Sequence, residues 1–512
     1  MNTSDDKKDI EASARDSSPD HAVGEVKNIK HNKNQDAALD FLRSEAEVRP
    51  MSPADEKRLL RKIDWRVIPL MFGCYTLQYL DKTLINYANV MGLQEDANIT
   101  GGQFSLLAMI FHVSYLGCEF PHAYGMQALP TAKYLGAMVC FWGLIVCVTC
   151  AAKNWAGLVT TRVLLGVFES AVAPSLMLIT TMWYKRSEQP YRVGIWYIGV
   201  GVGTMGGSLM SFGFQHYDSS TFTSWQILFL VVGLITISVG ALVIFFLPDS
   251  PMRCKFLTHE EKVWTIERLR ANQTGIENKT VKPEQILECF MDPQTWLLSL
   301  IMISANVPNG AVSSYQATII KGFGYDSKTV ALLQLPSGAV AIVSVLIATW
   351  LAGRYEQRGL NVVAILCPGI LGGCLLSFLP DDNKVGLLIG NYLTNCIGST
   401  IPLLYSWVGA NYAGHTKKTT MNATLLISFC LGNIIGPLTF TEQSAPDYIP
   451  AKITIVVTCA FAAVLALILR CYYMWENKRR DNMADQGVLG HLQDIEFADV
   501  TDRKNKEFRY RL

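Results

Sequence analysis

The sequence predicts an all-α membrane protein with twelve transmembrane helices in two groups of six. Twelve apolar stretches run through the chain, and a helix of about 20 apolar residues crosses a hydrocarbon core of about 30 Å. Half of the 512 residues are hydrophobic, only 17% are charged and the mean hydropathy is +0.23, whereas a soluble domain carries about 25% charged residues. One long polar stretch separates the sixth apolar stretch from the seventh.

The expected spans lie near residues 67–90, 104–125, 134–152, 156–182, 191–213, 226–247, 295–320, 329–352, 360–379, 385–408, 419–440 and 451–474. They divide the chain into an N-terminal half (63–247), a cytosolic linker (248–294), a C-terminal half (295–474) and a cytosolic C-terminal tail (475–512). Residues 1–62 lack the apolar core of a signal peptide and are expected to form a disordered cytosolic tail. In the linker, Thr258 and Glu261 have capping-box spacing and begin one amphipathic helix over 263–269.

The distribution of lysine and arginine predicts the orientation. With the N-terminus in the cytosol, the inner segments carry the linker's cations and Lys57, Arg58, Arg61, Lys62, Arg66, Lys133, Lys185, Arg186, Arg192, Arg354, Arg358, Lys417, Lys418, Lys478, Arg479 and Arg480. The outer loops then carry only Lys153, Lys321, Lys328, Lys384 and Lys452. Because cytosolic loops are enriched in such residues, both termini are expected in the cytosol.

Composition and motifs argue against several functional classes. The net charge of +1 favours no nucleic-acid partner. Most of the thirteen cysteines lie inside apolar stretches, where they are typical small hydrophobic residues. No nucleotide-binding loop or hydrolase nucleophile motif is present. We therefore expect no enzymatic activity, no cofactor and no metal site.

Charged residues inside the spans indicate a transport pathway. Arg162 and Glu169 lie seven residues apart in the fourth span, on one helical face, and Asp81 and Lys82 lie near the outer end of the first. A charge in hydrocarbon costs roughly 3 kcal/mol or more, so such groups usually face water or one another. We expect Asp81, Lys82, Arg162 and Glu169 to line one chamber.

These charges suggest a coupling mechanism. Without substrate, two cations and two carboxylates form a neutral cluster in which each carboxylate is held ionised by a nearby cation. An arriving organic anion competes for Lys82 and Arg162, and the displaced acids, Asp81 and Glu169, take up protons. Proton and anion binding then favour each other.

Other polar residues in the spans are secondary candidates. His112 and Glu119 share one face of the second span and are assigned to proton coupling, although packing, or an inner-gate role for Glu119, is an alternative. The C-terminal half carries amides but almost no charge, so it is expected to shape the substrate pocket. Asn309, Asn395 and the ring of Tyr315 are the candidate contacts, with Asn309 beside a Pro308 interruption of the seventh span.

Several strings carry a resemblance to a known family. They are YLDKTLINYANVMGL (79–93), YLGCEFP (115–121), RVLLGVFESAVAPSLMLITTMWYKRSEQPYRVGIWY (162–197), LPDSPMRCKFLTHEEKVWTIERLRANQTGIENK (247–279), WVGANYAGHTKKTTMNA (407–423) and GNIIGP (432–437). From Trp65 to about Trp475 the chain resembles the fungal allantoate permease family, within the anion:cation symporters of the major facilitator superfamily. Relatives often have Asp-Arg where this chain has Asp81 and Lys82.

The resemblance implies the major facilitator fold and roles for four residues. The acid-base pair ending span one and the Arg and Glu of span four serve substrate binding and proton coupling in the family. They match Asp81, Lys82, Arg162 and Glu169. The implied activity is proton-coupled uptake of a small organic anion, such as a carboxylate vitamin or ureide, across the plasma membrane.

Two other functions remain open on the sequence. The first is export of a toxic or secondary metabolite, which net efflux from intact cells would reveal. The second is a nutrient sensor that keeps the fold and signals through its tails. For all three, the expected partners are a small molecule and the lipid bilayer, with protons added for the symporter.

Overall fold

The computed structural model describes residues 51–185, 188–217, 222–252, 254–270, 282–355, 357–444, 448–485 and 500–512. The chain divides into two units, Met1–Pro50 and Met51–Leu512, and the second unit is described by itself. Most of the expected N-terminal tail therefore lies outside the described residues.

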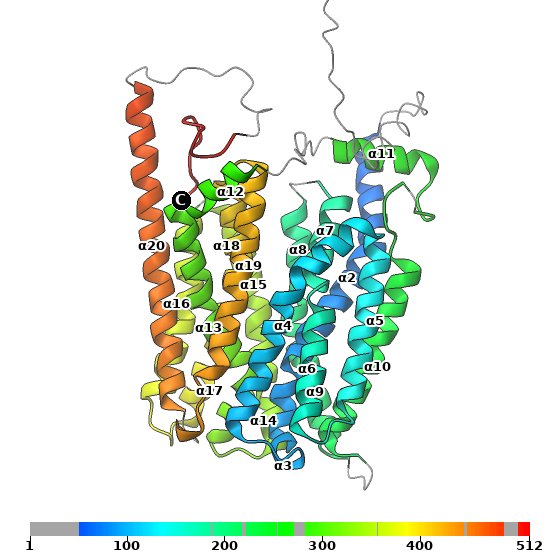
Figure 1. Cartoon of the computed structure of the whole chain (residues 1–512), viewed down its shortest axis with the longest axis vertical. Coiled ribbons are helices and arrows are strands. Elements are labelled where there is room, and N and C mark those ends of the chain that lie inside the picture. Colours follow the sequence, from blue (N-terminus) through cyan, green and yellow to red (C-terminus); the bar gives the residue numbers. More distant parts are fainter. Residues whose placement is uncertain are drawn as a thin grey trace, which may run out of the picture. The chain divides into compact units, whose positions relative to one another are not determined.

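Six helical spans form the N-terminal half (Figure 1). They are α2 (Pro53–Val90), α4 (Gly101–Ala128), α5 (Thr131–Thr149), α6 with α7 (Trp155–Glu169 and Val172–Trp183), α8 with α9 (Gln189–Tyr197 and Gly199–Phe214) and α10 (Ser224–Phe246), with the short α3 (Leu93–Asp96) after α2. Side chains cap several of these helices: Thr100 and Gln103 form a capping box at the start of α4. Such caps satisfy backbone N–H groups that have no partner inside the helix.

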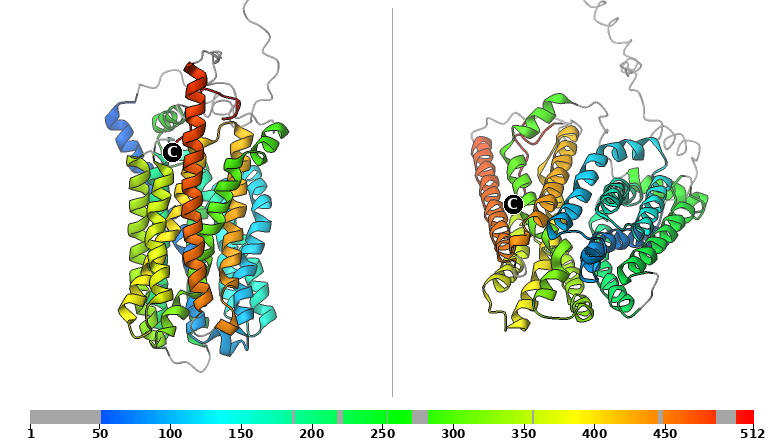
Figure 2. Two further views of the ribbon diagram at one scale, coloured as in Figure 1. Left: turned by 90° about the vertical axis from the view of Figure 1, so that its left-hand side faces the viewer. Right: turned by 60° about the horizontal axis from the view of Figure 1, so that its bottom comes forward.

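Six further spans form the C-terminal half, which lies beside the first (Figure 2). They are α13 (Pro293–Gly322), α14 with α15 (Ser327–Leu333 and Leu335–Arg354), α16 (Arg358–Phe378), α17 with η1 and α18 (Lys384–Thr394, Asn395–Ser399 and Thr400–Asn411), α19 (His415–Leu438) and α20 (Ile449–Asp485). Eleven of the twelve spans are long and apolar enough to cross a membrane. The exception is α2, because Gln78, Asp81 and Lys82 interrupt its apolar run. The predicted twelve-helix, all-α architecture is confirmed.

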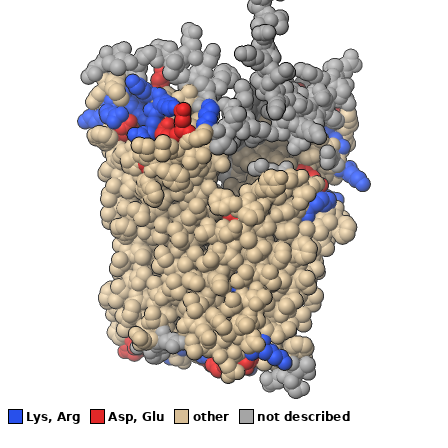
Figure 3. Space-filling model, viewed as in Figure 1, with Lys and Arg blue, Asp and Glu red and all other residues tan. Residues whose placement is uncertain are grey.

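On the face shown in Figure 3, a band almost free of charge covers the side of this unit, and lysine, arginine and acidic residues gather at its two ends. Tan surface covers the height of the helices between these ends. This distribution is the one that a lipid bilayer requires, since charges are costly in hydrocarbon.

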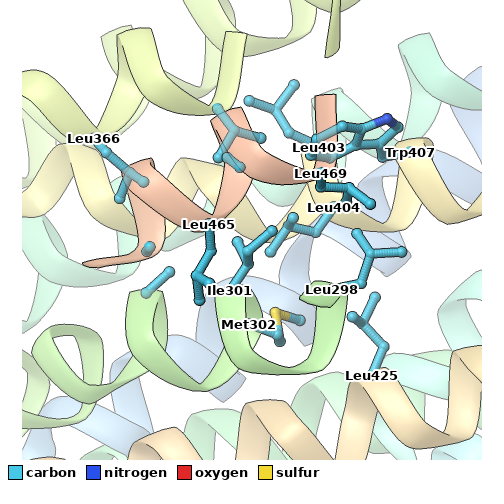
Figure 4. Packing of buried hydrophobic residues seen from close by; sticks show 14 of the residues in the cluster. Leu298, Ile301, Met302, Leu366, Leu403, Leu404, Trp407, Leu425, Leu465 and Leu469 are labelled. Atoms are coloured by element: carbon cyan, nitrogen blue, oxygen red, sulfur yellow. The ribbon is translucent and has the colours of Figure 1, made fainter. Parts of the chain in front are cut away.

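Leucine-rich packing holds the C-terminal half together (Figure 4). Leu298, Ile301 and Met302 of α13 meet Leu404 and Trp407 of α18, and all five are fully buried. In the N-terminal half, glycines bring α9 against α2. A methyl group on Gly203 would lie 2.7 Å from the backbone oxygen of Thr76, so no larger residue fits there.

Prolines break several spans. A proline lacks an N–H group and its ring collides with the carbonyl group four residues earlier. Pro174 stands four residues after Ser170, where α6 gives way to α7, and Pro402 stands four residues after Gly398 in η1. By contrast, α13 remains one helix through Pro308, where an interruption was expected.

Two helices extend past expected domain boundaries, and the linker contains one helix more than expected. Helix α2 begins at Pro53, so residues 53–62 are helical, and α20 continues past residue 474 to Asp485. The linker contains two helices, α11 (His259–Arg270) and α12 (Pro283–Phe290), where one was expected. These ends are polar and are stabilised by ion pairs outside the apolar band, which a search for apolar runs does not detect.

Each linker helix is fixed to one half. Arg268 of α11, with a side chain 1% exposed, pairs with Glu56 of α2 at 3.1 Å and with Glu188 at 2.6 Å. Lys417 of α19, fully buried, pairs with Glu288 of α12 at 3.1 Å and with Asp292 at 2.8 Å. The linker helices therefore belong to different halves.

The two halves meet at the end opposite α11 and α12. Asn86 of α2 donates to Gln334 at 3.1 Å and accepts from the backbone of Ala317 at 2.8 Å. Asn89 donates to Thr318 at 2.9 Å. At the α11 and α12 end, the surface between the halves is recessed in Figure 3.

Candidate functional site

Helix α2 sends two adjacent charged side chains in different directions. Consecutive residues of an α-helix are about 100° apart around its axis. Asp81 points into the N-terminal half, where Trp142 Nε1 of α5 donates to Asp81 Oδ2 at 2.8 Å. Lys82 points to the other half, where its Nζ donates to Asn433 Oδ1 of α19 at 3.0 Å. The acid is thus inside one bundle and the amine is between the two.

Arg162 and Glu169 of α6 complete a group of four charges. Both are almost fully buried, at 4% and 2% exposure. Glu169 lies within Coulombic range of Asp81, Lys82 and Arg162, and Asp81 lies within range of Arg162. The structure therefore brings together the four residues that were expected to share a chamber.

The four charges are not joined by direct ion pairs, in contrast to the expected cluster. Among these described side chains, no nitrogen of Lys82 or Arg162 lies within 4.0 Å of a carboxylate oxygen of Asp81 or Glu169. Arg162 instead lies 6.0 Å from the ring centre of Phe229, a favourable cation–π position. In this conformation the cations and carboxylates therefore attract one another at separations longer than 4.0 Å.

Three buried oxygens in this group have no hydrogen-bond donor in the described chain. They are Gln78 Oε1, Asp81 Oδ1 and Glu169 Oε2. Gln78 stands three residues before Asp81, on the same face of α2, and its Nε2 makes a long 3.5 Å contact with the backbone oxygen of Glu169. Buried acceptors almost always have a donor, so these oxygens require one from a proton, water or a ligand.

Neutral amides face Lys82 from the C-terminal half. Asn433 Oδ1 accepts from Lys82 and also from Asn309 Nδ2 of α13, at 3.1 Å. The ring centre of Phe429 lies 5.7 Å from Lys82 Nζ. Asn309 and Lys82 therefore share one acceptor, the amide oxygen of Asn433.

Asn395 lies in η1, where its Nδ2 donates to the backbone oxygens of Asn391 and Tyr392 at 3.1 and 3.3 Å. In this conformation the Asn395 amide is therefore bonded to backbone oxygens at the break in its own helix. The carbonyl of Gly398 lacks its usual donor four residues on, because that residue is Pro402, and it accepts from the Tyr197 hydroxyl of the N-terminal half at 3.3 Å. The broken tenth span thus makes a further contact between the halves.

His112 and Glu119 lie on the same face of α4. His112 is 4% exposed and lies within Coulombic range of Lys82 and Arg162, so it belongs to the charged group. Its Nδ1 lies 3.1 Å from the backbone oxygen of Ala108, which places a proton on Nδ1. Glu119 is nearer the α11 and α12 end, and its Oε2 is buried without a donor in the described chain.

Tyr315 is engaged at the end where the halves meet. Its ring stacks on Phe440, with centroids 4.2 Å apart and planes 6° apart. Its hydroxyl lies 2.5 Å from Ser105 Oγ of α4. In this conformation Tyr315 seals the interface between the halves and presents no free face to a substrate ring.

Several residues of the site were not singled out from the sequence. Asn433 lies in the GNIIGP string but was only one of many amides in the C-terminal half. Gln78 could have been found from its three-residue spacing to Asp81. Trp142 carries no sequence signal, because tryptophan in a span is usually an interface anchor.

Two helical halves around a buried group of charges and amides define a membrane transporter. The chain belongs to the major facilitator superfamily, whose sequence pattern matches residues 71–437. A thiamine pathway transporter of Saccharomyces cerevisiae is 38% identical over 88% of this chain and 86% of its own length. The allantoate permease of the same yeast is 34% identical over 92% of this chain and 89% of its own length.

These relatives are transporters rather than enzymes, and the predicted likeness to the allantoate permease family is confirmed. A bacterial homologue of the human lysosomal transporter Spinster, solved in an inward-facing and unoccupied conformation, has a similar fold. The TM-score is 0.61 at 17% sequence identity, over 79% of this chain and 96% of that chain. The chain is therefore a multi-pass membrane transporter with the major facilitator fold.

Proposed function

We propose that this transporter imports a small organic anion together with protons, by alternating access across the plasma membrane. The name of the allantoate permease relative indicates an anionic ureide as its cargo. A carboxylate with amide groups would match a site made of cations and amides. The class of substrate we propose is accordingly a small carboxylate or ureide anion.

The observation that carries this proposal is the position of Lys82. Its ammonium group lies between the halves, and its nearest partner across the interface is the neutral amide of Asn433. A lysine bound by an amide has no negative charge in direct contact, so an anion can replace the amide without first displacing a carboxylate. Coulombic attraction at short range is worth roughly 4 kcal/mol at an effective dielectric of 20.

Proton coupling follows from the charges behind Lys82. The group of Asp81, Lys82, Arg162 and Glu169 is neutral when all four are ionised. One proton on a carboxylate gives it a net positive charge, which strengthens anion binding. By thermodynamic linkage, anion binding then strengthens proton binding to the same extent. The unpartnered oxygens of Asp81 and Glu169 are the atoms that we assign to the proton.

Access to the site depends on orientation. The distribution of lysine and arginine predicts that the α11 and α12 end faces the cytosol. In that orientation, the contacts of Asn86 and Asn89 close the outer side. The conformation described is then the inward-facing one. Rocking of the halves would break the outer contacts and expose Lys82 to the outside.

Uptake by reconstituted protein tests the proposal. Proteoliposomes with an inward proton gradient are screened with a panel of carboxylates, beginning with allantoate. We expect at least one anion to accumulate, and a protonophore to abolish its accumulation. Efflux against the gradient would indicate export, and binding without flux would indicate a sensor.

Two variants then separate anion binding from coupling. Arg162→Ala is expected to lose anion binding. Glu169→Gln is expected to keep exchange of internal for external anion but to lose accumulation driven by the gradient. If both variants concentrate the anion as the parent does, the assigned site is wrong.

A further inference from the structure

Residues 500–512 lie against the α12 end of the C-terminal half (Figure 1, red segment). They were expected to be part of a tail, yet Thr501, Asp502 and Tyr510 are buried, at 1%, 0% and 4% exposure. We call residues 500–512 the tail segment. Its position has no part in the proposed anion site and requires an explanation of its own.

Asp502 is the polar anchor of the tail segment. Its Oδ1 pairs with Lys417 of α19 at 2.8 Å. Its Oδ2 accepts from Gln294 of α13 at 3.0 Å and from Tyr510 at 2.8 Å. Two donors of the C-terminal half, Lys417 and Gln294, therefore bind this fully buried carboxylate, and Tyr510 of the tail segment itself supplies a third hydrogen bond.

Tyr510 is the apolar anchor. Its ring stacks on Tyr473 of α20, with centroids 4.9 Å apart and planes 15° apart. The guanidinium carbon of Arg480, also on α20, lies 4.6 Å from the centre of the Tyr510 ring. Asn477 exchanges two hydrogen bonds with the backbone of Tyr510, at 2.8 and 2.9 Å. Helix α20 therefore contacts both the ring and the backbone of Tyr510.

The last residues are bound through their backbone. Asn411 of α18 donates to the Arg511 oxygen at 2.9 Å and accepts from the Arg511 nitrogen at 2.7 Å. Trp407 Nε1 donates to the same oxygen at 3.2 Å. The backbone nitrogen of Arg358 of α16 donates to the oxygen of Leu512. The end of the tail segment is therefore held through its backbone by α18 and α16.

The tail segment also contacts linker helix α12. Thr501 Oγ1 donates to Glu288 of α12 at 3.0 Å, and Glu288 pairs through its other oxygen with Lys417. Lys417 therefore holds α12 and the tail segment at once. Removing the tail segment would leave α12 with fewer partners on the C-terminal half.

We propose that the α12 end of the C-terminal half is a peptide-binding groove whose ligand is the chain's own tail segment, and that its occupancy clamps α12 to α18 and α20. The clamp keeps the linker helix moving with the C-terminal half when the halves rock. This role is independent of which substrate is carried, so it stands or falls separately from the proposed anion site.

Binding of a separate peptide tests the groove. The full chain carrying Tyr510→Ala is titrated with a fluorescent synthetic peptide of residues 500–512. We expect saturable binding, and apparent binding to the parent chain at least about tenfold weaker, because the attached segment competes at a high effective concentration. Peptides with Asp502→Asn or Tyr510→Ala should bind about thirtyfold more weakly or worse. The Lys506→Ala peptide is the matched control, since Lys506 is exposed, and should bind normally.

Equal binding of all four peptides, or none to either chain, would overturn the groove. Hydrogen exchange then tests the clamp in the full chain. Asp502→Asn and Tyr510→Ala are expected to speed amide exchange in α12, while α11 on the other half serves as the internal reference. Unchanged exchange in α12 in both variants would show that the tail segment clamps nothing.

Discussion

Lys82 Nζ lies 3.0 Å from Asn433 Oδ1, and this hydrogen bond joins a helix of the N-terminal half to a helix of the C-terminal half. The two partners are 351 residues apart in the chain. Because the bond pairs a charge with a neutral amide, it is weaker than an ion pair and an anion can displace it. The contact links the two halves, and under the proposed function it would also be the place where the substrate anion binds.

Replacing Lys82 tests its assignment as the anion contact. Lys82→Met keeps much of the side-chain volume and removes the charge, and we expect carboxylate binding to weaken by about thirtyfold or more, the typical result of losing a buried charge partner. Lys82→Arg should retain binding with altered preference among carboxylates, because its fork has a different geometry. Calorimetry on purified protein measures both, with exposed Lys153→Met as control. Normal binding by Lys82→Met would remove this residue from the site.

Substitutions of Asn433 test whether a negative charge beside Lys82 competes with the substrate anion. Asn433→Asp places a carboxylate beside Lys82, where it competes with the substrate, and we expect anion affinity to fall about tenfold or more. Asn433→Leu removes only a hydrogen-bond acceptor and should cost about 1 kcal/mol, or roughly fivefold. Competition binding with a labelled anion distinguishes the two. Equal effects would mean that charge at this position does not matter.

Close packing of Gly201 and Gly338 sets the contact between α9 and α15, across the two halves. A methyl group on Gly201 would lie 2.3 Å from the backbone oxygen of Gly338. Gly201→Ala is expected to destabilise this conformation by about 1–3 kcal/mol through overpacking. Gly213, also on α9, has nothing within 4 Å of an added methyl group, so Gly213→Ala should be neutral or stabilising by about 0.5–1 kcal/mol. Thermal unfolding in detergent checks this pair, and equal stability of the two variants would count against the described packing.

The seal at Tyr315 predicts a graded loss of stability. Tyr315→Phe removes the hydroxyl contact with Ser105 and should cost about 1 kcal/mol. Tyr315→Ala also removes the stack on Phe440 and should cost about 3 kcal/mol. The exposed Tyr217→Ala is the control, expected to change stability by less than about 0.5 kcal/mol. If Tyr315→Ala were as stable as the parent but bound anion poorly, Tyr315 would belong to the substrate site after all.

Sequence alone was sufficient for the twelve-helix architecture because apolar runs follow directly from the bilayer. It was also sufficient to group Asp81, Lys82, Arg162 and Glu169, since charges in hydrocarbon have few acceptable places. It did not predict that these charges lack direct ion pairs, because pairing depends on ångström-scale placement of separate helices. Spacing along one helix cannot supply that information.

The opposite direction of Asp81 and Lys82 shows the same limit. From the sequence alone, these adjacent residues were treated as one acid-base pair. Helix geometry separates their side chains by about 100° around the axis, so Asp81 points into the N-terminal half and Lys82 points toward the C-terminal half. The tail segment was missed for another reason. Its anchors, Asp502 and Tyr510, are a polar pair in a charged stretch, and only the fold brings Lys417 and Tyr473 to meet them.

The most direct test of proton–anion coupling needs no imposed pH gradient. Proteoliposomes at equal internal and external pH, loaded with a pH-sensitive dye, receive an inward gradient of the anion identified in the uptake screen. Coupling predicts that anion entry carries protons with it and acidifies the lumen, and that Glu169→Gln abolishes the acidification. Anion entry with no change of internal pH in the parent protein would contradict the account.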